Sequence, residues 1–178
     1  MMVDRFVSSR TGPALLAGEP GAVIRRAKGG VEMVNLVWGL SPGRDGGRAM
    51  TVVRCEGRRF VRRRCLVPAS EFFFSAGSGT ARRKWRFTLA DGDWFYFAAI
   101  WQPASRDWPP AYAILTIPSG PDLAPFRDRQ MAVIRREARM KWLDGARPET
   151  ETLKALPAGS WRAEQVEGPP EEAKLFDW

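Results

Sequence analysis

Two aromatic-rich apolar segments, KWRFTLA at 84–90 and WFYFAAIW at 94–101, set the strongest constraint on the fold of this chain. Aromatic and β-branched residues favour a pleated, partly buried surface, and the Asp-Gly-Asp sequence between the segments is typical of a tight turn. We therefore predict two strands paired as a hairpin. Apolar and alternating patterns predict further strands at 31–38, 65–75, 111–117, 130–134 and 161–166.

Helix signals are few. Residues 136–145 place apolar side chains at helical spacing and end on Gly145, which suits the left-handed residue that closes a helix. A second short helix is expected near 13–17. Many strands with few helices predict the α+β class, in a single domain over 1–178 built on a strongly curved, barrel-like, mainly antiparallel sheet. Residues 145–178 are expected to form a peripheral C-terminal segment.

The charge of the chain indicates the kind of partner it binds. Its formal net charge is +8 and its pI is near 10.3, and six of its arginines cluster between positions 54 and 64. A basic surface of this kind attracts polyanions, so we expect a nucleic-acid partner. The alternative is an arginine-rich protein whose charge serves no partner.

The cysteine count and the apolar segments bear on the compartment. Two cysteines in 178 residues provide no disulfide framework, and no apolar stretch approaches the roughly 20 residues that span a bilayer. The N-terminal sequence MMVDRFVSSR lacks the pattern of a secretory signal. We expect a cytoplasmic protein with reduced thiols and no membrane partner.

Histidine is absent from the chain, which excludes every mechanism that needs an imidazole base, acid or metal ligand. A zinc site would have to draw four ligands from two cysteines and carboxylates. Neither of the glycine-rich phosphate-binding motifs, GxxxxGK[ST] or GxGxxG, occurs. We therefore expect no metal and no cofactor.

Eight short motifs follow one another along the chain: DRFV at 4–7, VWGLSP at 37–42, GRAMT at 47–51, RRRCLVPA at 62–69, FAAIW at 97–101, AILTIPSG at 113–120, RQMAVI at 129–134 and WLD at 142–144. In this order they resemble the SRAP family, the SOS-response-associated peptidase fold that senses abasic sites in single-stranded DNA. The resemblance extends over nearly the whole chain, and RRRCLVPA followed by aromatics is its most specific part. It implies an SRAP-like fold and a role in the DNA-damage (SOS) response.

The resemblance also implies a site. In SRAP proteins a cysteine that follows the initiator methionine traps the ring-opened abasic-site aldehyde, and an asparagine, a glutamate and a histidine complete the site. The matching positions here hold Val3, Gly46, Phe74 and Asp128, or Arg127 at the last position if one residue is inserted. The family's nucleophile and acid–base groups are thus exchanged for other residues. We expect a pseudoenzyme without the covalent chemistry.

Two acids are candidate substitutes, Glu71 and Asp128. Glu71 lies three residues before Phe74, so on a regular strand the two side chains point to opposite faces. Asp128 has no nucleophile beside it. Cys65 stands where the family keeps a cysteine outside its reactive centre, and we expect it in the core; Cys55 is also expected to be structural.

The predicted DNA contacts are arginines. They come from family positions that contact the DNA backbone and from the arginine cluster, and the full set is Arg5, Arg48, Arg54, Arg62, Arg63 and Arg129. Phosphate contacts give affinity without sequence information and weaken as salt rises. Trp38 and Trp101 are candidates for base stacking, but core packing is the favoured interpretation of both.

Three functions are compatible with the sequence. The first is a catalytically silent SRAP-like protein that binds single-stranded or abasic-site DNA. The second is an active peptidase or DNA lyase that uses Glu71 or Asp128. The third is a non-enzymatic protein-interaction module on the same scaffold. Dispersed arginines and a family site filled by Phe74 would favour the third function over the first.

Overall fold

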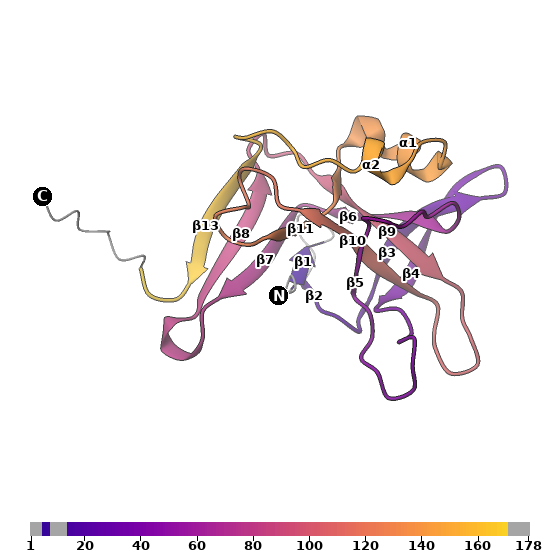
Figure 1. Ribbon diagram of the computed structural model, residues 1–178, viewed down its shortest axis with the longest axis horizontal. Helices are drawn as coiled ribbons and strands as arrows, with labels where there is room; N and C mark the ends of the chain where they lie inside the picture. The colour runs from indigo at the N-terminus through magenta and orange to yellow at the C-terminus, as the bar shows by residue number, and fades with distance from the viewer. Residues whose placement is uncertain (1–4, 8–13, 171–178) are drawn as a thin grey trace, which may run out of the picture.

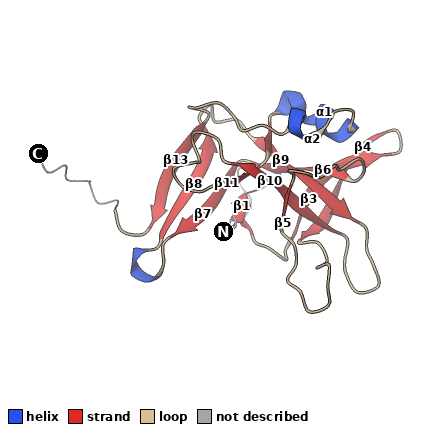
Figure 2. Cartoon of the chain, in the orientation of Figure 1, coloured by secondary structure: helices blue, strands red, loops and turns tan. Residues whose placement is uncertain are grey.

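The computed structural model describes residues 5–7 and 14–170, and Val3 lies outside these residues (Figure 1). The described chain is mostly sheet, with short helices only (Figure 2). Its strands form two sheets, one of five strands and one of eight. No helix in this part of the chain is long and apolar enough to cross a membrane.

The five-stranded sheet is antiparallel throughout. From edge to edge its strands are β13 (Trp161–Glu167), β8 (Arg83–Leu89), β7 (Glu71–Ala76), β1 (Arg5–Val7) and β2 (Ala14–Leu15). The N-terminal strand β1 thus lies against β7, which carries the aromatic residues that follow the RRRCLVPA motif.

The eight-stranded sheet closes into a ring. Its strand order is β11 (Arg129–Met131), β10 (Ala111–Pro118), β4 (Gly30–Trp38), β3 (Pro20–Ala27), β6 (Arg64–Ala69), β9 (Phe95–Gln102) and β12 (Val133–Ile134), with β5 (Val52–Arg54) beside β10. The ring closes because β9 also pairs with β10. The pairings of β10 with β4 and with β5 are parallel and the others antiparallel, so the predicted α+β class with a curved, mainly antiparallel sheet is confirmed.

The predicted hairpin of 84–90 with 94–101 is wrong. Both segments form strands, β8 and β9, but β8 pairs with β7 and β13, whereas β9 pairs with β6, β10 and β12. The Asp-Gly-Asp segment does turn, with the Gly92 N–H donating to the Leu89 carbonyl, but it carries the chain from one sheet to the other. Strand β9 is buried along most of its length and needs neighbours on both edges, which a two-stranded hairpin would not provide.

The segment at 130–134 is divided between two partners. Ala132 separates β11 from β12, and its N–H donates to Leu115 in β10 while its carbonyl accepts from Ala98 in β9. The chain therefore leaves one strand of the ring and joins the next within a single residue.

The predicted helix at 136–145 is present in a shorter form. A 3₁₀ turn, Arg136–Ala138, leads into α1 (Arg139–Asp144), and Gly145 closes the helix at φ 66° with its N–H on the Trp142 carbonyl. Helix α2 (Glu149–Thr152) follows it, and both helices lie near β6 and β9 in Figure 1. The short helix expected near 13–17 is wrong, since residues 14–15 form β2 instead.

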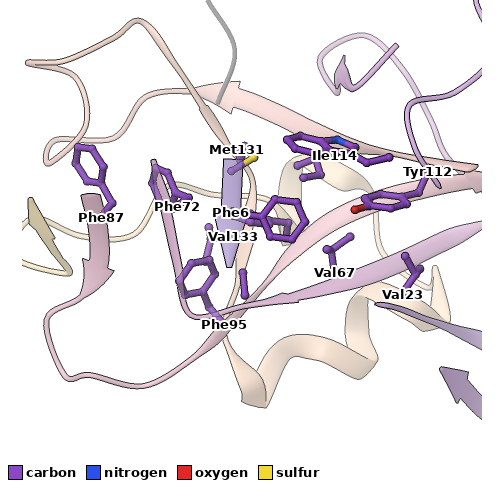
Figure 3. Packing of buried hydrophobic residues seen from close by; sticks show 14 of the residues in the cluster. Phe6, Val23, Val67, Phe72, Phe87, Phe95, Tyr112, Ile114, Met131 and Val133 are labelled. Atoms are coloured by element: carbon purple, nitrogen blue, oxygen red, sulfur yellow. The ribbon is translucent and has the colours of Figure 1, made fainter. Parts of the chain in front are cut away.

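One large aromatic cluster joins the two sheets. Phe6 of β1 lies near its middle in Figure 3, with its ring centroid 5.1 Å from Trp38 and 5.4 Å from Phe97. Phe97 in turn lies 6.0 Å from Phe72 of β7. Trp161 of β13 packs 5.2 Å from Phe72, so a strand far along the chain completes the same core.

Candidate functional site

Position 74, where the resemblance places the family's glutamate, lies in the core. The Phe74 side chain is fully buried and stacks on Phe87 at 5.3 Å, and Phe126 packs against it edge-on at 5.8 Å. The guanidinium of Arg127 lies 5.3 Å from the centre of the Phe74 ring. The space around this position is thus apolar, with one cation at its border.

Glu71 lies on the other face of β7, as its spacing from Phe74 predicts. Its carboxylate is 3.8 Å from the guanidinium of Arg86, which also pairs with Glu164 across the β8–β13 strand pair. The three side chains form a charged row on the face of the five-stranded sheet opposite the aromatic cluster. Glu71 therefore faces away from the environment of Phe74.

A pocket of about 440 Å³ is lined by Asp128 and by Phe126 and Arg127, both of which contact the Phe74 ring. We call it the arginine pocket, since Arg54, Arg127 and Arg129 line it together with Phe126 and Asp128. Asp128 is exposed, and its backbone carbonyl accepts a hydrogen bond from the Ser119 N–H. The structure thus gathers two of the predicted DNA-binding arginines and one candidate acid at a single opening.

The arginines of this pocket differ in how far their charge is compensated. Arg129 donates to both carboxylate oxygens of Glu56, at 2.5 and 2.8 Å, and to the Thr116 carbonyl at 2.8 Å. These hydrogen bonds from Arg129 lower the pKa of Glu56 to about 2, so the glutamate stays ionised and offsets the charge of Arg129. Arg54 is exposed, and no carboxylate of the described residues forms an ion pair with it.

The arginine cluster divides into exposed and buried members. The sequence assigned all six arginines between 54 and 64 to a basic surface, and for the last of them, Arg64, this is wrong because it is buried. Its guanidinium pairs with the buried carboxylate of Glu149 at 2.8 Å and lies 4.2 Å from the Trp142 ring. The other five arginines between 54 and 63 are exposed.

The buried arginine ties the helices to the sheet. Besides Glu149, Arg64 donates to the carbonyls of Phe60, Trp142 and Arg147. The same Glu149 oxygen accepts the Phe60 N–H at 2.6 Å. Burial raises the pKa of Glu149, but the hydrogen bonds from Phe60 and Arg64 and the charge of Arg64 outweigh it and hold the pKa below its usual value.

Several predicted residues lie away from the arginine pocket. Gly46 (φ 71°) and Arg48 are exposed in the loop between β4 and β5 and are not among the residues that line it. Arg5 lies in β1, where its backbone pairs with Phe73. Arg63 also has a left-handed backbone (φ 61°), and its guanidinium lies 5.9 Å from the ring of Trp101.

The two tryptophans differ in their packing. Trp38 is buried, and its indole N–H donates to the Thr51 carbonyl at 2.9 Å, so its predicted place in the core is confirmed. Trp101 is only half-buried, and Arg25 covers its ring at 4.1 Å.

Neither thiol has the environment of a nucleophile. Cys65 is fully buried, as predicted, and burial raises its pKa well above the usual value. Cys55 is also buried, and burial together with the charge of Glu56 raises its pKa. Among the described residues no group of three or more histidine, cysteine, aspartate or glutamate side chains could hold a metal ion.

Phe126 and Trp85 were not among the site residues predicted from the sequence. Phe126 lies in a turn between β10 and β11, and its ring is 5.0 Å from Trp85 of β8. Phe126 also lines a second pocket, of about 460 Å³, on the side of Trp85. An isolated phenylalanine in a proline-containing turn carries no periodic signal, which is why the sequence did not reveal it.

The architecture places the protein in a class of known structures. It is similar to two structures from Bordetella bronchiseptica: a protein with 22% identity (TM-score 0.69, covering 90% of each chain) and a phage-related protein with 20% identity (TM-score 0.69, covering 86% of this chain and 80% of that one). A Bacteroides thetaiotaomicron protein is similar at 17% identity, with a TM-score of 0.69 over 86% of this chain and 77% of that one. At such identities the likeness shows a shared fold, that of a small α+β protein with a ring of strands.

The family follows from the sequence match. The family model described as SOS response associated peptidase (SRAP) matches residues 15–168. This match covers most of the chain, and the protein therefore belongs to the SRAP family. A search of curated proteins found no match.

Proposed function

We propose that this SRAP-family protein binds single-stranded DNA through its phosphates and forms no covalent bond with it. The observation that carries the proposal is the arginine pocket, which Arg54 and Arg127 line and which is linked to the buried Phe74 ring through its contacts with Phe126 and Arg127. A cationic opening can hold a phosphate, whereas a phenyl ring can neither donate nor accept a proton.

The exposed arginines support the binding half of the proposal. Five of them, between 54 and 63, share their segment with a single carboxylate, Glu56, which is paired with Arg129. We expect Arg54 and Arg62 to add more to DNA affinity than Arg129, whose charge Glu56 already offsets. A net charge of +8 would add long-range attraction for any polyanion.

The chemistry of the pocket supports the non-covalent half. Asp128 is the acid in its lining, and neither described thiol lines it. Covalent trapping of an aldehyde needs a free amine or thiol, and a carboxylate alone supplies neither. An enzyme that uses Asp128 for acid–base catalysis remains the rival hypothesis, and the experiment below distinguishes the two.

The interaction-module hypothesis is the other rival. Phe74, at the position that the resemblance assigns to the family's glutamate, is buried, as that hypothesis requires. The arginines are not dispersed, however, since Arg54, Arg127 and Arg129 line one opening next to it. This grouping favours a polyanion over an uncharged protein surface as the ligand.

A salt titration of DNA binding tests the proposal. Fluorescence anisotropy with labelled single-stranded DNA should show binding at about 50 mM salt that weakens steeply as salt rises. Replacing Arg54 or Arg62 by glutamine should weaken binding and lower the salt slope by about one each. The matched control is Lys28→Gln, in the exposed turn between β3 and β4, and it should change neither quantity. Absence of binding at low salt would contradict the proposal.

A denaturing gel separates binding from catalysis. Incubation with abasic-site DNA should leave no covalent adduct and no cleavage beyond that of the DNA alone. An adduct or cleavage product that disappears in Asp128→Ala would instead establish the enzyme hypothesis.

A further inference from the structure

The second pocket, which we call the aromatic pocket, lies on the aromatic face of the β7–β8 hairpin. Trp85, Phe126 and Pro125 provide its large apolar surfaces, and Ala76 and Ala81 provide small ones. Its volume of about 460 Å³ falls within the range of about 300–1,000 Å³ that small-molecule sites occupy. It is therefore large enough for a planar heterocycle.

The turn of the hairpin forms one border of this pocket. Gly77 adopts φ 84°, and a Cβ on it would lie 2.6 Å from the Ala81 carbonyl oxygen. Only glycine fits this position of the turn, because any side chain would collide with the Ala81 carbonyl. The 3₁₀ turn Gly79–Ala81 then places Ala81, an exposed residue with a small side chain, at the border of the pocket.

The aromatic geometry suits a stacked ring. Trp85 and Phe126 meet at 5.0 Å with an interplanar angle of 64°, so the edge of one ring points at the other. Trp85 is half-buried and lines the pocket, so part of its indole surface remains available to a ligand. Such a surface gains the most binding free energy from a flat π system. Nucleobases are flat π systems, and they stack on aromatic side chains whatever the nucleotide sequence.

Cationic side chains lie at this pocket and at the pocket next to it. Phe126 lines the aromatic pocket and the arginine pocket alike, so the two are separated by one side chain. Arg83 also lines the aromatic pocket, and its guanidinium donates to the carbonyls of Pro169 and Pro170. Both of these acceptors are neutral, so neither of them offsets the charge of Arg83. An apolar slot with cations near it matches a nucleotide strand, in which each base is flanked by phosphates.

We propose that the aromatic pocket receives an unpaired nucleobase of the DNA strand whose phosphate lies in the arginine pocket. The base stacks on Trp85 beside Phe126, and Arg83 faces the next phosphate along the strand. This inference rests on the proposed DNA-binding function and adds to it the part of the nucleotide that the second pocket recognises.

The test compares two strands with the same phosphates. One is a thymidine strand of about 12 nucleotides, and the other is a tetrahydrofuran-spacer strand of the same length, which has no bases. At about 50 mM salt, the wild-type protein should bind the thymidine strand about 5- to 150-fold more tightly. Trp85→Leu should remove most of this preference and leave affinity for the spacer strand unchanged.

Two further variants keep the test decisive. Ala81→Phe fills the pocket without removing a core contact, so it should abolish the preference even if Trp85→Leu fails to fold. Trp94→Leu is the matched control, because Trp94 is also half-buried and lies 5.0 Å from an aromatic neighbour, Tyr96, but does not line this pocket. It should keep the full preference.

Equal binding of both strands by the wild type, or a preference that Trp85→Leu and Ala81→Phe both retain, would overturn the base pocket while leaving DNA binding in place. Binding of neither strand would overturn the proposed function as well.

Discussion

The buried pair of Arg64 and Glu149 allows a quantitative prediction. Both side chains are almost fully enclosed, with 4% and 3% of their surface exposed. Replacing Arg64 by methionine would leave the Glu149 carboxylate buried with the Phe60 N–H as its remaining partner among these groups. An uncompensated charge of this kind costs about 3–5 kcal/mol of unfolding free energy.

This loss is a large part of the stability of any domain, which is about 5–15 kcal/mol in total. For a chain of this size it corresponds to a fall in Tm of about 6–20 °C. The double variant Arg64→Met/Glu149→Leu should be more stable than Arg64→Met alone, since no charge is then left unpaired. It should not reach the wild type, because the Phe60 N–H loses its acceptor, at a cost of about 1–3 kcal/mol.

Denaturant unfolding followed by tryptophan fluorescence measures these differences. The matched control is Arg62→Met, which removes an exposed arginine two positions away and should change the free energy of unfolding by less than about 0.5 kcal/mol. The reasoning would be refuted if Arg64→Met were no less stable than Arg62→Met, or if the double variant were less stable than Arg64→Met.

Three further outcomes follow from the structure. The pKa of Glu149 is lowered from its usual 4.5, so its contribution to the free energy of unfolding is complete above about pH 4.5 and is lost as the pH falls through the lowered pKa. In denaturant unfolding between about pH 5 and pH 2, the free energy of unfolding should therefore fall less for Glu149→Gln than for the wild type. A thiol-specific reagent should label Cys55 and Cys65 at least about tenfold more slowly in the native protein than in denaturant, since both are buried; fast native labelling would contradict their assignment to the core. Gly145→Ala should lower the unfolding free energy by about 1 kcal/mol, because φ is 66° there, whereas Gly43→Ala, at a position without positive φ, should have little effect.

Most strands could be predicted from local patterns, whereas their pairing could not. Apolar runs identified β4, β9 and β10 because burial on a pleated surface imposes a pattern on neighbouring residues. The turn at 91–93 led to the wrong pairing prediction. Its residues favour a change of chain direction, but they do not determine which strand the following segment pairs with. Which strand β9 pairs with depends on segments such as β6 and β12, which are distant in sequence.

In the candidate site, too, the features set by local sequence could be predicted, whereas those set by distant residues could not. The opposed faces of Glu71 and Phe74 follow from the period of two along a strand, and the sequence alone predicted them. The burial of Arg64 could not be predicted, because Glu149, which makes it favourable, lies 85 residues further along. The role of Phe126 as the wall between two pockets depends likewise on β7 and β8, which contribute Phe74 and Trp85.

Strand β13 has a consequence for how the molecule is made. It covers the outer edge of β8 and brings Trp161 onto Phe72 and Phe95. Until this late segment has left the ribosome, β8 offers unpaired backbone groups beside exposed aromatic rings, which is the kind of surface that captures strands from other molecules. Strand β13 thus protects the edge of β8 from self-association, and a chain cut short before Trp161 should accumulate in aggregates.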